Sequence, residues 1–265
     1  MTVRMRIALK IAYDGAAFYG HQRQPDARTV EGEAIAALTA ARIIRDPHEA
    51  FFRSASRTDR GVSAVGNVIA FNTSYAPGAA IGAFNDRARD VWAWAFAVVP
   101  EDFHPRGAEE RWYRYHLFEN VPLEPLLAAA RLFVGEHDLS SFTSDPPQGP
   151  HPIRRIDVRQ DDEAILVDLR ARSFRRGMVR RIVAAMLAHA GGDVTIAEIE
   201  EALRGRLHDF GVVPPEPLVL MDVAYGFPFE IALKPKVRDE WRAREVEAAL
   251  RLRFLRDVKD AVREI

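Results

Sequence analysis

Alternation of apolar and polar residues along the chain predicts most of its strands. In residues 6–13, Ile7, Leu9 and Ile11 fall on one face of an extended segment and Ala8 and Lys10 on the other. This period of two is typical of a half-buried strand. The continuous apolar run at 91–99 is typical of a buried strand. Further strands are expected at residues 67–71, 111–118, 153–159, 165–171 and 218–225.

Helical spacing of apolar residues predicts the helices between these strands. Thr29 precedes the first of them and has the side chain of a good N-cap. His137-Asp138, shortly after Gly135, is expected to be a turn and capping feature where a helix ends. The predicted helices cover residues 30–41, 79–90, 123–134, 177–190 and 196–203.

The charged tail from residue 238 to residue 265 predicts one more helix. Val246, Leu250, Phe254 and Val258 recur every four residues, and Ile265 extends the same stripe. An apolar stripe on a charged helix marks the face that packs against something else. We expect this helix to pack onto the body of the protein rather than to bind nucleic acid.

The order strand, helix, strand, strand occurs once in each half of the chain. This order favours an α+β fold with two similar units over a doubly wound sheet. We place the N-terminal half at residues 1–107, the C-terminal half at 108–228 and the charged helical tail at 229–265.

Composition narrows the function classes. The 265 residues include no cysteine, which excludes disulfides, thiolate catalysis and Cys-ligated zinc. The longest apolar runs are far shorter than a membrane span, and no signal-peptide pattern opens the sequence, so a cytoplasmic location is expected.

The formal net charge of −1 does not suggest a nucleic-acid-binding protein. The local clustering of charge does suggest nucleic-acid binding, because six arginines and no acid lie between residues 170 and 181. They form either a phosphate-binding patch or a solvated face balanced by acids from elsewhere.

The segment 56–64 is the strongest candidate for chemistry. Asp59 stands between Thr58 and Arg60-Gly61, immediately before an apolar strand. Gly61 allows a tight turn that presents the carboxylate, and Arg57 and Arg60 would lower its pKa if they lie close. Taken alone, the segment is also compatible with an ordinary Asx-turn.

Two other segments carry suitable side chains. Tyr113 and Tyr115 share one face of a predicted strand; either they are core residues, or one of them stacks on a base and moves a proton. Phe174 to Arg181 opens a helix with arginines that can pair with a carboxylate or a phosphate. The eight histidines lack metal-ligand spacing, and no glycine-rich phosphate loop occurs.

Taken together and in order, these segments resemble the tRNA pseudouridine synthase A family along most of the chain. The similar segments are Tyr13-Asp14-Gly15 with Gln22, Gln24 and Thr29-Val30-Glu31; Arg57-Thr58-Asp59 with Gly61-Val62; 102–106 with Tyr113-Arg114-Tyr115; 135–142; Phe174 with Met178-Val179-Arg180; and 214–218 with 220–223. Residues 25–32 resemble archaeal members, and together with the long charged tail they suggest an archaeal-type enzyme. The chain departs from the common pattern at His21, Arg60 and Ser63, which belong to the RNA-facing loops.

The resemblance implies a fold, an activity and site residues. It implies two ferredoxin/RRM-like halves that share a mixed central sheet with a basic cleft, in a homodimer without metal or organic cofactor. The implied reaction converts uridine to pseudouridine at positions 38–40 of the tRNA anticodon stem-loop. Asp59 would be the catalytic carboxylate, Tyr113 the base-stacking tyrosine suited to proton transfer, and Arg180 the partner of Asp59. The tRNA would be bound by Gln22, Gln24, Arg57, Arg60, Tyr113, Phe174, Arg175 and Arg176.

Two alternatives remain at this stage. A tRNA-binding protein that does not catalyse, acting as an RNA chaperone, would keep the basic patch but would not need Asp59. A hydrolase would need a second carboxylate beside Asp59, and no acid stands in an obvious partner loop.

Overall fold

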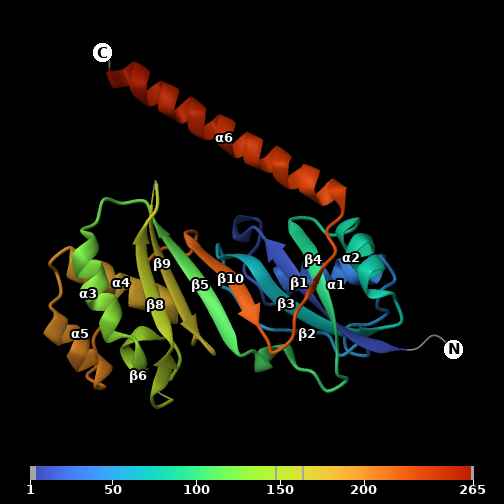
Figure 1. Ribbon diagram of the computed structural model, residues 1–265, viewed down its shortest axis with the longest axis horizontal. Coiled ribbons are helices and arrows are strands. Elements are labelled where there is room, and N and C mark those ends of the chain that lie inside the picture. The colour runs from blue at the N-terminus through green and yellow to red at the C-terminus, as the bar shows by residue number, and fades with distance from the viewer. Residues whose placement is uncertain (1–3, 147, 163, 264–265) are drawn as a thin grey trace.

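One mixed sheet runs through the whole molecule (Figure 1). The computed structural model describes residues 4–146, 148–162 and 164–263. Within these residues nine strands form the sheet, in the order β11-β4-β1-β3-β10-β5-β9-β8, with β2 paired to β3. The strands are β1 (Met5–Tyr13), β2 (Arg53–Ser54), β3 (Ser63–Thr73), β4 (Val91–Val99), β5 (Glu110–Leu117), β8 (Arg155–Gln160), β9 (Ile165–Ala171), β10 (Leu218–Ala224) and β11 (Glu230–Ile231).

The two halves of the sheet repeat one topology. The first half has the spatial order β4-β1-β3-β2 and the second has β10-β5-β9-β8, so β1 corresponds to β5 and β4 to β10. The halves join where Val219 and Leu220 of β10 run parallel to Ser63 and Ala64 of β3. The predicted fold of two similar α+β units on a shared mixed sheet is therefore confirmed. The predicted boundary after residue 107 falls between the short helix η2 (Pro105–Gly107) and β5, and it stays a prediction.

Helices cover the sheet in both halves (Figure 1). Thr29 caps α1 as predicted, since its side chain accepts a hydrogen bond from the Gly32 N–H. The second predicted helix is shorter than expected and is not polar all round: it starts at Pro77, ends at Asn85 and buries Ile81 and Phe84. The helices on the body are α1 (Val30–Ala40), α2 (Pro77–Asn85), α3 (Leu123–Leu132), α4 (Met178–Ala190) and α5 (Ile196–Leu203).

The prediction that β1 is half-buried was wrong, because both of its faces are covered. Ile7, Leu9 and Ile11 lie in the core, as expected. On the opposite face Lys10 forms an ion pair with Asp222 and lies 5.1 Å from the ring centre of Phe229. The aromatic segment 225–229 follows β10 and covers this face of β1. The polar Lys10 is therefore buried in an ion pair and does not face solvent.

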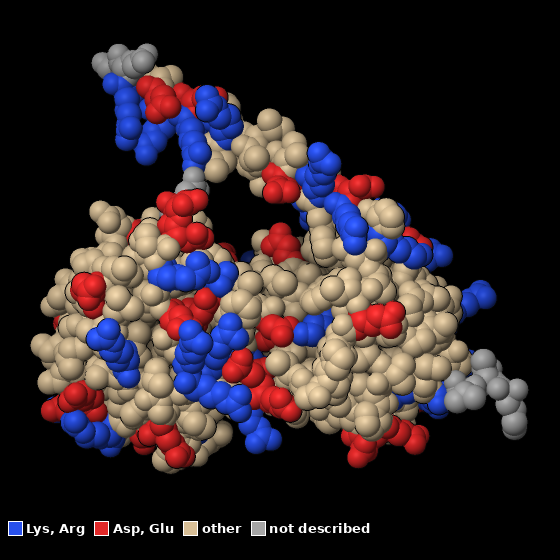
Figure 2. All heavy atoms as spheres, in the orientation of Figure 1, with Lys and Arg blue, Asp and Glu red and all other residues tan. Residues whose placement is uncertain are grey.

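The prediction that the C-terminal helix packs onto the body was also wrong. Among the described residues, the beginning of helix α6 (Pro235–Arg263) contacts the first half, where Trp241 meets Trp92 with ring centres 6.2 Å apart and Arg244 pairs with Asp90. Beyond this the helix extends past the edge of the sheet, and Figure 2 shows a gap between its middle part and the body. The apolar stripe is solvent-exposed as a result; Ile265 lies outside the described residues.

The segment around His137 differs from its prediction in part. Helix α3 ends at Leu132, and Gly135–His137 forms a short strand, β6, that pairs with β7 (His151–Ile153). A small separate sheet therefore replaces the expected helix exit. The capping prediction holds for Asp138, whose carboxylate accepts a hydrogen bond from the Ser140 N–H at 2.8 Å.

Candidate active site

A basic cleft of about 870 Å³ lies between the two halves. The first half supplies the loops at 19–24 and 55–62, and the second half supplies β5 and the segment from Ser173 to Arg180. All of the site residues predicted from the sequence line this one cleft, although they come from four separate parts of the chain. Its charged lining comprises seven arginines (Arg57, Arg60, Arg106, Arg111, Arg175, Arg176 and Arg180) and two aspartates (Asp59 and Asp145).

The loop that carries Asp59 joins β2 to β3 and is held rigidly at its base. The side chain of Asn67 bonds to the backbone of Ser56, donating to its carbonyl at 2.9 Å. The hydroxyls of Tyr13 and Thr58 lie 2.9 Å apart, and the Thr58 carbonyl accepts from the His21 N–H at 3.0 Å. Each of these groups is buried. The carboxylate of Asp59 is therefore presented by a loop whose neighbours cannot move independently.

Gly61 has the backbone conformation that its sequence context predicted. Its φ is +85°, a left-handed angle that side chains disfavour. A Cβ at this position would lie 3.1 Å from Pro215 and 3.2 Å from the carboxylate of Glu216, which belong to the second half. The loop can thus turn sharply after Asp59 and pack against the segment before β10.

Arg180, in the first turn of α4, reaches across the cleft to Asp59. Its Nη1 lies 3.2 Å from Asp59 Oδ2, and its Nε donates to the Val213 carbonyl at 2.8 Å. The side chain of Asp59 is 42% exposed and that of Arg180 is 17% exposed. The carboxylate is thus paired with an arginine and still partly open to a substrate.

Arg57 and Arg60, the two arginines nearest to Asp59 in sequence, do not share this role. Arg60 stacks on the ring of Tyr19, with its guanidinium carbon 4.4 Å from the ring centre. Arg57 is exposed and lines the cleft. Within the described residues, the ion pair of Asp59 is with Arg180. Sequence neighbours on a tight turn point in different directions, which explains why the partner comes from 121 residues away.

Tyr113 of β5 lines the same cleft. Its ring meets Phe174 edge-on, with ring centres 5.2 Å apart and planes at 86°. Burial raises the pKa of Tyr113 to about 12, against opposing effects of Arg111 and a hydrogen bond to Ser56. The hydroxyl is therefore protonated at neutral pH and can donate a hydrogen bond. Tyr115, by contrast, is a core residue whose hydroxyl donates to the Pro214 carbonyl at 3.0 Å.

Arg111 is a structural element of the site that sequence reasoning missed. It is buried, and it joins β5 to the base of the Asp59 loop: its Nε donates to Ser56 Oγ at 2.9 Å and its Nη2 to the Ala55 carbonyl at 3.1 Å. Burial lowers the pKa of this guanidinium. The period of two on β5 places Arg111 on the same face as Tyr113, and this signal was available in the sequence.

Five of the six arginines between residues 170 and 181 divide into two groups. Arg175, Arg176 and Arg180 line the cleft. Arg170 instead pairs with Glu110 at 3.1 Å, and Arg181 pairs with Asp209 at 3.4 Å. Both interpretations of this basic segment therefore apply, each to part of it.

Asp145 is a second acid in the cleft that the sequence did not reveal. Its Oδ2 accepts from the Arg176 backbone N–H at 3.0 Å, and its carboxylate lies 3.5 Å from the Arg176 guanidinium. It reaches the cleft from the loop after η3 (Ser140–Phe142), which has no sequence motif linking it to Asp59. This hydrogen bond and this ion pair fix the position of Arg176 at the rim of the cleft.

The remaining predicted residues border the cleft from the first half. Gln22 and Gln24 are exposed, and the Gln24 amide donates to the Tyr19 carbonyl at 3.0 Å. Over the part of the chain that the structure describes, no cluster of three or more His, Asp or Glu side chains is placed to hold a metal ion. No helix in that part is long and apolar enough to cross a membrane.

Comparisons with known proteins agree on one family. A family model described as tRNA pseudouridine synthase matches residues 129–226. The tRNA pseudouridine synthase A of Thermococcus sibiricus is 47% identical over 233 residues, which cover 86% of this chain and 88% of the relative. That of Pyrococcus abyssi is 40% identical over 257 residues, 95% of each chain. Among solved structures, a Cbf5-Nop10-Gar1 complex shows a distant likeness, with a TM-score of 0.34 and 13% identity over 69% of this chain and 45% of that one.

Proposed function

Because the chain belongs to the tRNA pseudouridine synthase A family, we propose that it isomerises uridine to pseudouridine in tRNA, with Asp59 as the catalytic carboxylate. The observation that carries this proposal is the ion pair between Asp59 and Arg180, which forms in a basic cleft only when the two halves come together. A partly exposed carboxylate that is paired with one arginine and lies among others suits chemistry on a polyanionic substrate.

The reaction is an isomerisation, so no atom is gained or lost from the base overall. The bond between C1′ and N1 breaks, the base rotates, and C5 bonds to C1′ while its proton leaves and N1 takes one up. Asp59 either attacks C1′ or removes a proton from the sugar; both need an ionised carboxylate. Arg180 holds that carboxylate in place through an ion pair and a hydrogen bond.

The target uridine must leave the base stack to reach Asp59. Extruding a base costs a few kcal/mol, and phosphate contacts with arginines offset part of that cost. Arg57, Arg60, Arg175 and Arg176 are placed along the cleft for such contacts. Tyr113 and Phe174 form the aromatic wall on which the extruded base packs. We assign the target to positions 38–40 of the anticodon stem-loop.

The exposed helix α6 supports the further proposal that the enzyme works as a homodimer in the cytoplasm, where its tRNA substrate is found. Leu250 and Phe254 are 66% and 65% exposed, and they belong to one apolar stripe. We propose that the same stripe of a second copy of the chain packs against it, so that both stripes are buried in the homodimer.

The experiment that tests the function is release of tritium from unmodified tRNA whose uridines carry the label at C5. Forming the new C5–C1′ bond expels that hydrogen, so release by the wild-type enzyme reports the isomerisation itself. Binding of tRNA without release would favour the non-catalytic RNA chaperone, an interpretation that the paired and accessible Asp59 does not support.

A further inference from the structure

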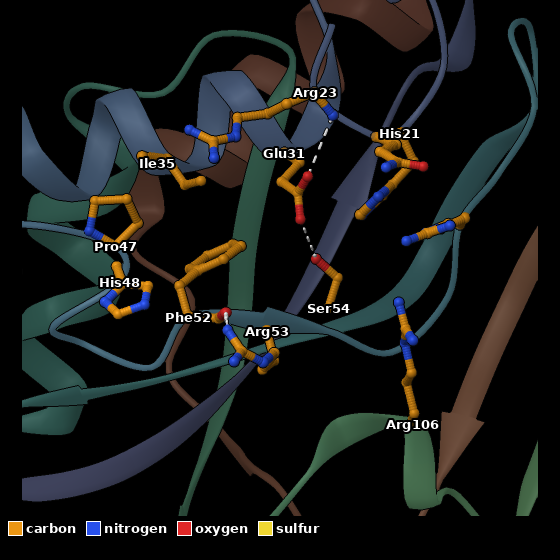
Figure 3. A pocket seen from close by; sticks show the side chains of 12 residues that line it. His21, Arg23, Glu31, Ile35, Pro47, His48, Phe52, Arg53, Ser54 and Arg106 are labelled. Carbon is orange, nitrogen blue, oxygen red and sulfur yellow. Dashed lines mark hydrogen bonds between the residues drawn. The ribbon is translucent and has the colours of Figure 1, made fainter.

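A second, smaller pocket opens beside the cleft, entirely within the first half and its junction with η2. It has a volume of about 250 Å³. Four residues line both it and the cleft: His21, Gln22, Arg57 and Arg106. Figure 3 shows the small pocket, with Arg106 approaching it from η2. A ligand that extends out of the cleft past Arg57 and Arg106 therefore reaches this pocket directly.

The walls of this pocket differ in character. One side is apolar, formed by Ile35, Pro47 and the ring of Phe52. The other side presents the carboxylate of Glu31, whose Oε2 accepts from the Arg23 backbone N–H at 3.2 Å and whose Oε1 accepts from Ser54 Oγ at 3.3 Å. Both carboxylate oxygens are thereby held in place and still have acceptor capacity.

His21 provides an independent sign that this pocket binds a ligand. The residue is 1% exposed, and within the described residues neither Nδ1 nor Nε2 has a hydrogen-bond partner. Buried polar groups without partners are uncommon in folded proteins. Burial lowers the pKa of His21 to about 4, so the ring is neutral at pH 7 and can donate through one nitrogen and accept through the other.

The charges around this pocket indicate that it would accept the base of a nucleotide rather than a phosphate. The exposed Arg53 lies at the edge of the small pocket, and Arg57 and Arg106 lie between this pocket and the cleft. Glu31 stands inside and would repel a phosphate. An apolar aromatic wall with an acceptor opposite suits a flat ring with donor groups. The volume is below that of pockets for drug-sized ligands, roughly 300–1,000 Å³, and fits a single base.

We propose that this pocket binds the base of a second, unpaired nucleotide of the RNA, one that carries an exocyclic amino group, while the target uridine occupies the cleft at Asp59. The proposal rests on the proposed function, since it presupposes an RNA substrate. Phe52 packs against the base, Glu31 accepts from its amino group, and Arg57 and Arg106 contact the phosphates that connect the two nucleotides. The pocket thus selects which uridine is presented, by requiring a suitable neighbour.

The test uses the full-length enzyme and unmodified tRNA transcripts in which each unpaired anticodon-loop nucleotide, one at a time, is made abasic. For the wild type, one position other than the target should raise the Kd for tRNA about tenfold, the size of effect that one stacked base produces. The same loss should follow when only the amino group is removed, by replacing guanine with hypoxanthine or adenine with purine. Glu31→Gln and Arg53→Ala should weaken binding of intact tRNA, and Glu31→Gln should no longer respond to the missing amino group.

Matched controls lie close by in the same half. Glu49→Gln and Arg45→Ala make the same changes at exposed positions that line neither pocket, and they should bind tRNA as the wild type does. If Arg53→Ala weakens binding but no abasic position matters, a phosphate rather than a base occupies the pocket and the proposal fails. If the wild type releases tritium normally and Glu31→Gln and Arg53→Ala bind like their controls, the pocket proposal fails while the proposed function stands. A wild type that neither binds tRNA nor releases tritium overturns both.

Discussion

Arg180 Nη1 lies 3.2 Å from Oδ2 of Asp59, although the two residues are 121 positions apart and belong to different halves of the sheet. The Arg180 Nε donates at the same time to the Val213 carbonyl, so the guanidinium is oriented by the segment before β10. The carboxylate is presented by one half and its charge partner by the other. Correct packing of the two halves is therefore a condition for the site to exist.

Replacing Arg180 should reduce catalysis far more than folding. Arg180→Ala removes the cation that faces Asp59, and we expect kcat to fall by about 10²-fold or more, as for other preorganised charge partners. Arg180→Lys should restore only part of the rate, since an ammonium group cannot bond to Asp59 and to the Val213 carbonyl in the same planar geometry. The measurement is tritium release at saturating tRNA. The control is Arg181→Ala, because Arg181 pairs with the exposed Asp209 outside the cleft; an equal loss there would contradict the assignment.

Asp59→Ala should abolish turnover while tRNA binding stays largely intact. The carboxylate makes the reaction possible, whereas the seven arginines of the cleft provide most of the attraction for phosphates. We expect kcat to fall by at least about 10⁴-fold and Kd to change by less than about threefold. Filter binding and tritium release on the same preparation separate the two effects. Asp209→Ala, which removes an exposed carboxylate from the other arginine pair, should change neither.

Much of the fold was predictable because its signals are local. The apolar run at 91–99 and the period-two pattern of 165–171 mark β4 and β9 with the observed bounds, and the repeated element order indicated two similar halves. What failed depends on distant partners. The polar Lys10 suggested a solvent-facing side for β1, but Asp222 and Phe229, more than 200 residues further along, bury it. The stripe on α6 correctly predicted an amphipathic helix, but no sequence pattern states what covers such a stripe.

The site was predictable to a similar extent and for similar reasons. Asp59, Tyr113 and Arg180 were found because each lies in a recognisable motif, and the structure brings all three to one cleft. Their roles remain predictions. Arg111 and Asp145 were missed: the first acts through backbone carbonyls and Ser56, and the second enters from a loop whose position depends on the packing of η3.

Tyr113→Phe separates proton transfer from packing. The substitution keeps the edge-on contact with Phe174 and the shape of the wall, and it removes only the hydroxyl. If that hydroxyl moves a proton during the reaction, kcat should fall by about 10²-fold or more while KM is retained. A rate within about twofold of the wild type would limit Tyr113 to base packing. Tyr115→Phe is the control, because its hydroxyl bonds to a backbone carbonyl.

Acidification should destabilise the protein through His21. Burial lowers the pKa of His21 to about 4 in the folded state, compared with about 6.5 when unfolded. Between these values the unfolded chain binds more protons, so stability is full above about pH 6.5 and falls as the pH drops towards 4. The loss attributable to His21 approaches about 3 kcal/mol at the lower limit. Urea unfolding at several pH values measures it, and His21→Phe should flatten this part of the profile. An unchanged slope would show that His21 is not the group responsible.

A charge in the exposed stripe of α6 should dissociate the enzyme without destabilising the chain. Leu250 is 66% exposed, so Leu250→Glu removes no core contact and the melting temperature of the monomer should be retained. In a homodimer the same side chain would be buried, and an uncompensated carboxylate there is costly. Ala249→Glu introduces the same group one residue earlier, on an exposed position outside the stripe, and should leave the dimer intact. Light scattering coupled to size-exclusion chromatography reads the outcome. A wild type that is monomeric at every concentration, or a dimer that tolerates Leu250→Glu, would mean that α6 does not hold two copies together.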